Sequence, residues 1–282
     1  MAQYTTVLAN EFNTVRTTVA NVLGTGATTR GYGSSITSYA VSTGSNISPA
    51  EFTALTTDIN TCYRHITNAD ATGLASVVSG NVITWSNIVT YQVAATYIDT
   101  NRDTNGGTVT NPAATSKVLS AGWGNASGNR IATVTGTFTW ANADAMRFYF
   151  NQNSKLIMSG TGATTGGTAK DNAFGTLATG VSLVFDKTNY RAGTGVSQAQ
   201  TTNVSPYSTG TPDGITVSIA APGTNTIGFT ITCSDTGDDG SVASNVAIDL
   251  TFNAATNDIS NTTGIAQHTP TITFATDWSY SA

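Results

Sequence analysis

Apolar residues in the first third of the chain recur at intervals of three and four, which is the spacing of an amphipathic α-helix. The first run consists of Leu8, Phe12, Val15, Val19 and Val22. Gly24 follows this run, and we expect it to take the left-handed backbone conformation that often ends a helix. The second run consists of Phe52, Leu55, Ile59, Cys62 and Ile66. The pattern therefore predicts two helices.

The second helix has a clear start signal. Ser48 precedes Pro49, and Glu51 stands three residues after the serine. In a capping box the serine oxygen accepts a free backbone N–H, while the glutamate side chain reaches back to the N–H of the serine. Proline suits the first helical position because its missing N–H is not needed there. We therefore expect the helix to begin at Pro49.

Residues 84–102 fit one face of a helix, although their β-branched side chains also suit a strand. The positions on that face are Trp85, Ile88, Val89, Gln92, Ala95 and Ile98. We favour a third helix, followed by a polar linker that runs from Asp99 to Pro112. Residues 1–110 are thus predicted to form a helical unit that docks or oligomerises.

From about Val118 the apolar positions alternate with polar ones, which is typical of strands. The alternating positions are Ala132 to Trp140, Met146 to Phe150, Val181 to Phe185, Ile215 to Ala220, Ile227 to Cys233, Val246 to Phe252, and Ile272 with Phe274. Turn signals such as Pro212-Asp213-Gly214 and Asp239-Gly240 separate them. The predicted fold class is therefore α+β, with the helical unit followed by an antiparallel β-sandwich over residues 118–282.

Charge is scarce and unevenly distributed. Charged residues make up 10% of the chain, against about 25% in typical soluble domains. From Ala192 onward there is no lysine or arginine, while seven aspartates occur. Strand edges are usually protected by lysine, because unpaired backbone groups recruit other chains. A β-region without that protection is expected to have its edges closed, covered or used for assembly.

Several classes of function find no support in the composition. The N-terminus lacks the basic and apolar regions of a signal peptide, and no apolar run approaches the ~20 residues that span a bilayer. From the missing apolar run we expect no association with a membrane. The basic residues are few and scattered, so we expect no binding of nucleic acid. Cys62 and Cys233 are expected to be buried small apolar residues.

Two loops carry oxygen-rich side chains. Asn101, Asp103 and Asn105 before Gly106 resemble the opening of a calcium loop, but the twelfth position is Pro112 and no acid begins the run. A solvated turn fits this segment better. In the second loop Asp235, Asp238 and Asp239 precede Gly240, which suits either a hairpin turn or a metal clip. We favour the turn and predict no metal ion or other cofactor.

Catalytic patterns are equally weak. His65 and His268 belong to no recognisable nucleophile or metal motif, and no pair of carboxylates is selected by spacing. Gly160, Gly162 and the pair Gly166-Gly167 lack the lysine of a phosphate-binding loop. We therefore assign no catalytic residue and expect the protein not to be an enzyme.

Aromatic residues offer the remaining candidate for ligand binding. Trp140, Phe148, Tyr149 and Phe150 could stack on a sugar, although their alternation indicates that most of them belong to the core. If the chain binds a glycan, Trp123 and Trp140 are the aromatic residues whose removal is expected to abolish binding.

Two stretches of the chain carry further motifs. The first stretch, within residues 10–66, contains Asn13-Thr-Val-Arg16, Val22-Leu23-Gly24-Thr-Gly26, Gly31-Tyr-Gly-Ser-Ser35, Val41-Ser-Thr-Gly44 and the helix with Phe52, Leu55, Asp58, Ile59 and His65. The second, within 118–160, contains Asp144-Ala-Met-Arg-Phe-Tyr-Phe-Asn151 and Lys155-Leu-Ile157. Together these motifs resemble virion structural proteins of tailed phages, especially contractile-tailed cyanophages, and the second stretch resembles an aromatic-rich strand of that family. The chain departs from the family at Ser34, where glutamine is expected, and at Phe52, where tryptophan is common.

The resemblance implies a structural component of the virion, in the tail, baseplate, collar or fibre apparatus. It implies other virion proteins as partners, a homo-oligomer of three or six copies, and assembly in the host cytoplasm. The alternatives are a carbohydrate- or host-receptor-binding module of the particle, and a capsid decoration protein. The third alternative is a depolymerase, which would need a pair of carboxylates that the sequence does not reveal. The family carries no catalytic residue that could be transferred to this chain.

Overall fold

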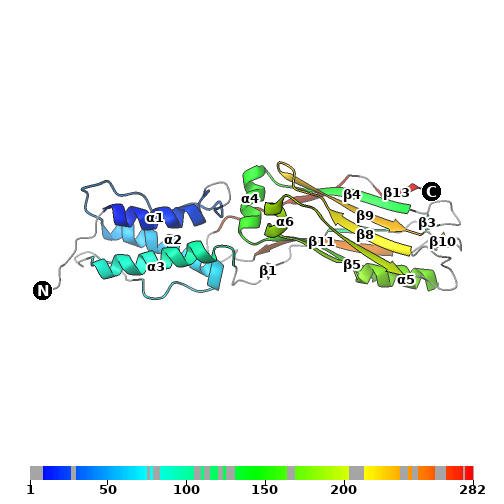
Figure 1. Cartoon of the computed structure of the whole chain (residues 1–282), viewed down its shortest axis with the longest axis horizontal. Coiled ribbons are helices and arrows are strands. Elements are labelled where there is room, and N and C mark those ends of the chain that lie inside the picture. Colours follow the sequence, from blue (N-terminus) through cyan, green and yellow to red (C-terminus); the bar gives the residue numbers. More distant parts are fainter. Residues whose placement is uncertain are drawn as a thin grey trace. The chain divides into compact units, whose positions relative to one another are not determined.

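The chain forms two compact units in the computed structural model (Figure 1). The structure describes residues 9–26, 30–74, 77–78, 83–104, 109–110, 115–119, 123–124, 131–163, 169–202, 213–235, 241–242, 247–257, 265–275 and 277–281. Unit 1 contains residues 1–110 together with 147–153 and 256–268. Unit 2 contains residues 111–146, 154–255 and 269–282. The chain therefore returns to unit 1 twice after leaving it.

Three helices form the body of unit 1. They are α1 (Ala9–Leu23), α2 (Pro49–Thr67) and α3 (Trp85–Asn101). The described residues of the apolar stripes predicted for the first two helices are buried, whereas Leu8 lies outside the described residues. Phe52 packs edge to face against both Phe12 and Tyr91, with ring centroids 5.3 Å apart in each pair. The third helix, ambiguous in sequence, is thus confirmed. Burial of one face on each helix holds the bundle together.

The predicted start of α2 is confirmed, and the predicted end of α1 is half right. The Glu51 carboxylate accepts the backbone N–H of Ser48, as a capping box requires. Helix α1 does end at Leu23, but Gly24 is not left-handed. A side chain at Gly24 would instead come within 2.7 Å of Ile36. The missing side chain at this position leaves room for the Ile36 side chain beside the helix end.

The segment around Met146 is a helix, which corrects the predicted strand. Helix α4 (Ala143–Asn151) contains Met146, Phe148 and Phe150, all of them buried. Tyr149, which the alternating pattern placed on the opposite face, is also buried. A short segment that is apolar on several sides satisfies both periods, so alternation could not distinguish helix from strand.

Unit 2 contains the longer strands, all paired antiparallel. The strands of the chain are β1 (Val109–Thr110), β2 (Thr115–Val118), β3 (Trp123–Gly124), β4 (Ile131–Thr139), β5 (Lys155–Ala163), β6 (Ser182–Phe185), β7 (Val196–Thr202), β8 (Asp213–Ile219), β9 (Thr226–Ser234), β10 (Ser241–Val242), β11 (Ala247–Asn257), β12 (Thr271–Phe274) and β13 (Ser279–Ser281). The larger sheet has the order β12-β4-β9-β8-β7, and β13 also pairs with β4. A second sheet joins β2, β11, β5 and β6, and β3 pairs with β10. The fold is therefore a mixture of helix and antiparallel sheet.

The predicted alternation is confirmed in the centre of the larger sheet. Along β4 and β9 every second residue is buried, and the intervening positions are mostly threonines that are only partly covered. The register pairs Val134 with Ile231 and Phe138 with Ile227 across the two strands. One face of this sheet therefore carries the core of unit 2.

The predicted turn at Pro212-Asp213-Gly214 is partly wrong. Asp213 and Gly214 begin β8, and the Asp213 side chain is buried. Pro212 lies outside the described residues, as do Asp239 and Gly240. An aspartate followed by glycine usually indicates a turn, but here the aspartate continues the buried positions of a strand.

Helix α5 (Ala169–Thr179) packs on β5, and helix α6 (Lys187–Ala192) follows β6. A side chain at Gly162 of β5 would come within 2.0 Å of the carbonyl oxygen of Gly175 in α5, so the two backbones lie in direct contact. Edge strand β7 is joined to the start of β6, because Gln198 accepts the Ser182 N–H at 2.8 Å and Gln200 donates to the Gly180 carbonyl at 3.0 Å. These glutamines link the two sheets.

Candidate functional site

A loop in unit 1 is held to α2 by one buried carboxylate. Asp58 is buried, and its two oxygens accept the backbone N–H groups of Thr37 and Ser38 at 2.9 and 2.8 Å. The hydroxyls of the same two residues donate to it at 2.7 and 2.6 Å. Four donors offset the cost of removing the carboxylate from water. Asp58 is therefore an anchor for the loop.

Gln152 ties three distant segments of unit 1 together. Its amide nitrogen donates to the carbonyl of Tyr32 and to the carbonyl of Ala266, both at 2.8 Å. Ser34 accepts the backbone N–H of Ala266 at 2.9 Å, and Asn151 donates to the carbonyl of Gly31 at 3.0 Å. The Gly31–Ser35 loop, residues 151–152 and Ala266 thus form one hydrogen-bonded network, which we call the loop clasp.

The loop clasp requires glycine at position 33. Gly33 has a φ of 73°, in the left-handed region, and a side chain there would come within 2.2 Å of the Phe148 ring. The Phe148 ring also packs against His268, with centroids 5.0 Å apart. Several residues of the phage-like stretches, Gly31–Ser35, Asp58 and Phe148–Asn151, therefore meet inside unit 1.

His65 is a core residue. Its ring lies 4.4 Å from the ring of Tyr32, and neither imidazole nitrogen has a hydrogen-bond partner among the described residues. Burial lowers the pKa of His65 from its ordinary value of 6.5 to about 3. Burial also raises the pKa of Tyr32, whose hydroxyl donates to the carbonyl of Arg102 at 2.7 Å. Neither group exchanges protons near neutral pH, so this pair does not serve as an acid or base there.

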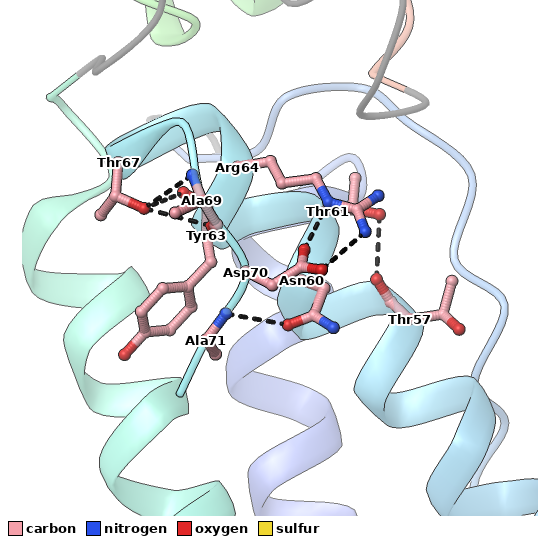
Figure 2. Close-up of polar contacts among 9 residues, drawn as sticks. All are labelled: Thr57, Asn60, Thr61, Tyr63, Arg64, Thr67, Ala69, Asp70 and Ala71. Atoms are coloured by element: carbon pink, nitrogen blue, oxygen red, sulfur yellow. Dashed lines mark hydrogen bonds and ion pairs between the residues drawn. The ribbon is translucent and has the colours of Figure 1, made fainter. Parts of the chain in front are cut away.

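An open groove of about 260 Å³ runs along α2. It is lined by Thr53, Thr56, Thr57, Asn60, Arg64, Leu74 and Val77. Figure 2 shows its polar end, where Arg64 forms an ion pair with Asp70 and Asn60 accepts the N–H of Ala71 at 3.1 Å. The threonine hydroxyls donate to backbone carbonyls one turn earlier, for example Thr57 to Thr53 at 3.0 Å. The groove therefore offers mainly acceptors and one neutralised guanidinium, which suits a polar ligand better than catalysis.

The outer face of α3 carries a stripe of exposed apolar side chains. Trp85, Val89, Val93 and Tyr97 follow one another at intervals of four residues, and each is at least 37% exposed. Residues three or four apart lie on one side of a helix. Asp99 is the one charged residue in α3. The sequence-based assignment of Trp85 and Val89 to the packing face is wrong, because both side chains are exposed. The second stripe was missed because a helix that is apolar on two sides does not show which side is buried.

The aspartate loop contains a buried ion pair. The Lys170 amine lies 2.5 Å from an Asp235 oxygen, and both side chains are almost fully buried. Asp238, Asp239 and Gly240 lie outside the described residues. Among the described residues no three histidine, cysteine, aspartate or glutamate side chains come together to hold a metal ion. Sequence reasoning did not identify Lys170, because a lysine in a helix usually faces solvent.

The first oxygen-rich segment ends a helix. Asn101 is the last residue of α3, and its amide donates to the carbonyl of Tyr97 at 2.9 Å. Thr104 donates to the carbonyl of Asn101 at 2.6 Å, which is the geometry of a turn. Asn105, Gly106 and Pro112 lie outside the described residues. The described part therefore agrees with the turn interpretation.

The remaining predicted candidates are mostly core residues. Trp140, Phe148, Tyr149 and Phe150 are all buried, so they offer no open stacking platform. Both cysteines are buried and unpaired, as predicted, and burial raises the thiol pKa of each. Gly160 and Gly162 lie in β5, whereas Gly166 and Gly167 lie outside the described residues. The side chain of Trp123 is also outside them.

Among the described residues, no helix is long and apolar enough to cross a membrane. Comparison with family models, with curated proteins and with solved structures found no match to this chain.

Proposed function

We propose that this chain is a non-enzymatic structural component of a tailed-phage virion, in the tail, baseplate, collar or fibre apparatus, where unit 1 assembles with further copies of itself. The observation that carries the proposal is the exposed stripe of Trp85, Val89, Val93 and Tyr97 on α3. Contiguous exposed apolar surface is uncommon in monomers and usually marks an interaction site.

The chemistry of the stripe favours another copy of the same chain as its occupant. Along α3 the one charged group is Asp99, and its carboxylate is paired with Arg30 and Arg102, so two or three such helices can approach without unpaired like charges on α3. Residues at intervals of four form a straight ridge that packs against an identical ridge. Closed rings of identical chains are the usual outcome of such contacts, and three or six copies match the symmetry of a phage tail.

Two further features support a structural role. In the loop clasp Asn151 and Gln152 hold backbone segments of the phage-like stretches together, and Asp58 separately anchors the backbone of Thr37 and Ser38. In unit 2, both sheets are antiparallel and Gln198 and Gln200 link them. We further infer that the two sheets stack as a β-sandwich, with the buried face of β4 and β9 turned toward the second sheet.

Sedimentation velocity over a wide concentration range tests the assembly. We expect a discrete trimer or hexamer for the wild type, and Val93→Glu is expected to yield monomers because it places a charge in the middle of the stripe. Thr17→Glu, at an exposed position of α1, is the matched control and is expected to leave the oligomer intact. A wild-type monomer at the highest concentration would contradict the proposal.

Location in the particle requires a separate measurement. Mass spectrometry of purified particles separated into heads and tails is expected to find this chain in the tail fraction. Detection in the head fraction would favour a capsid decoration protein. Absence from both fractions would rule out a virion component.

A glycan- or receptor-binding module is the second candidate, and the groove on α2 is the observation that favours it. Asn60 and the threonines present acceptors and amide groups of the kind that sugar hydroxyls bind. A glycan array of host-surface polysaccharides checks this, with loss of binding expected for Asn60→Ala. Trp140→Ala is unsuited to the test, because Trp140 is buried and its loss would disturb the core.

A further inference from the structure

The most unusual chemical arrangement in unit 2 is a lysine–aspartate pair sealed from water. Lys170 lies in the first turn of α5, and Asp235 follows directly after β9. The Lys170 amine and an Asp235 carboxyl oxygen lie 2.5 Å apart, and their side chains are 6% and 0% exposed. Burial of such a pair costs several kcal/mol per ion, which the mutual attraction seldom repays in full. The arrangement therefore calls for an explanation beyond stability.

A second carboxyl group lies on the same face of the sheet. The register of β8 and β9 ends with Gly214 opposite Ser234, and extending it by one position sets Asp213 opposite Asp235. Asp213 lies two residues before the buried Ile215 and Asp235 two residues after the buried Cys233, so both aspartates continue the buried alternation. Opposed residues of an antiparallel pair have Cβ atoms about 5 Å apart on one face. Asp213 is 2% exposed, so this second acid is buried as well.

We propose that Lys170 and Asp235 join in an intramolecular amide bond that forms spontaneously after folding, with Asp213 assisting. The site therefore modifies its own chain and uses no other substrate. The fold supplies the two conditions for such a reaction, which are close approach of the reacting groups and exclusion of water. Held in contact, two reacting groups attain effective concentrations on the order of 10⁵ M or more.

The reaction balances without any added reagent. Within the dry pair the ammonium of Lys170 passes one proton to the carboxylate of Asp235, which leaves a neutral amine and a neutral acid. The amine nitrogen then attacks the Asp235 carboxyl carbon and forms the C–N bond. The C–O bond to the hydroxyl breaks, and one water leaves. Asp213 takes a proton from the nitrogen and delivers it to the departing hydroxyl, so that it ends in its starting state.

The bond would fasten the first turn of α5 to the end of β9. Elements that the hydrogen bonds of the sheet do not join would then be linked covalently. Cross-links between distant residues lower the entropy of the unfolded chain, as disulfides do. An amide differs from a disulfide in that reducing agents leave it intact. This inference is independent of the proposed virion role, because an amide within one chain requires no partner.

Mass spectrometry of the purified, denatured full-length protein tests the proposal directly. We expect the intact chain to be lighter than its sequence by one water. Because the chain has no lysine or arginine after Arg191, trypsin would leave Asp235 in one peptide, residues 192–282. With the amide present, trypsin would not cut after Lys170, and residues 156–187 would appear joined to residues 192–282.

Variants locate the bond. Lys170→Arg keeps the positive charge but cannot form the amide, and Asp235→Ala removes the carboxyl group; both are expected to have the full sequence mass. Asp213→Asn keeps the reacting pair and is expected to slow or stop water loss, which a purely structural role would not do. Lys117→Arg is the matched control. Its ion pair with Asp277 spans 2.7 Å, but Asp277 is 89% exposed, so no bond is expected there.

Two results would overturn the proposal. One is a folded wild-type protein with the full sequence mass. The other is a loss of water with normal tryptic cleavage after Lys170, which would indicate cyclisation of an aspartate such as Asp213 with the nitrogen of Gly214. Rapid water loss in a folded Asp213→Asn variant would refute the role given to Asp213.

Discussion

The Phe229 ring occupies the space that a side chain of residue 136 would fill. Gly136 in β4 lies directly opposite Phe229 in β9, and a Cβ atom at Gly136 would come within 2.2 Å of the ring. The same ring contacts Phe138 at 5.2 Å and Phe274 at 5.6 Å between centroids. The core of the larger sheet thus depends on one glycine that leaves room for an aromatic cluster.

Gly136→Ala is expected to lower the free energy of unfolding by about 1–3 kcal/mol, because the methyl group forces the Phe229 ring out of its position. Thermal and urea denaturation of the variant measure the loss. Gly228→Ala is the matched control in β9, where a Cβ atom would find its nearest neighbour at an ordinary 3.8 Å. The control is expected to be neutral or slightly stabilising. Equal destabilisation by both substitutions would contradict this account.

Asp58→Ala is expected to destabilise unit 1 by about 2–3 kcal/mol, because it leaves the buried backbone N–H of Ser38 and the partly buried N–H of Thr37 without their acceptor. Urea denaturation measures the loss. Hydrogen exchange provides a local readout, in which the amides of Thr37 and Ser38 lose protection before the helices do.

The control for Asp58 is Asp70→Ala. It breaks the ion pair with Arg64, whose two side chains are 39% and 50% exposed. Exposed pairs of this kind contribute less than about 1 kcal/mol. Comparable losses from the two substitutions would show that Asp58 is no anchor.

His65 makes unit 1 sensitive to acid. Its pKa is about 3 in the folded protein and near 6.5 when unfolded, so between these values the unfolded state binds more protons. The contribution of neutral His65 to the free energy of unfolding is therefore fully present above pH 6.5. It is lost as the pH falls toward 3, at ~1.4 kcal/mol per pH unit at most. Denaturation measured at several pH values within this window is expected to show the slope.

The variant His65→Leu separates this effect from other titrating groups. It cannot take up a proton, so the acid slope is expected to become shallower. His268→Gln serves as the comparison, because the pKa of His268 is also lowered by burial, although that side chain is only partly covered. An unchanged slope in His65→Leu would refute the assignment.

The sequence alone predicted the helices and strands correctly wherever one period of apolar residues dominated. The stripes of α1 and α2 and the alternation in β4 and β9 are each buried on the expected side. Helix α4 was missed because Phe148, Tyr149 and Phe150 are buried on several sides, a pattern without a single period. Asp213 was assigned to a turn because Pro-Asp-Gly is a strong turn signal. In the structure this residue instead occupies a buried position of β8.

The candidate sites were harder to foresee, since they depend on contacts between distant residues. Lys170 and Asp235 carry no shared motif, and only the packing of α5 beside the larger sheet brings them together. Gln152 likewise gives no sign in the sequence that it spans Tyr32 and Ala266. The four-residue spacing of the stripe on α3 is visible in the sequence. Which of the two apolar sides of α3 faces solvent, however, depends on tertiary packing.

The double hydrogen bond of Gln152 also sets the order of events during synthesis. Unit 1 contains α1, yet its network needs Ala266, which lies far along the chain. At ~5–20 residues per second, translation reaches that residue on the order of ten to fifty seconds after it has completed α1. The first unit to be made therefore cannot be completed until most of unit 2 has been translated. During that interval α1, α2 and α3 wait without their closing segment and are exposed to capture by chaperones or by neighbouring nascent chains.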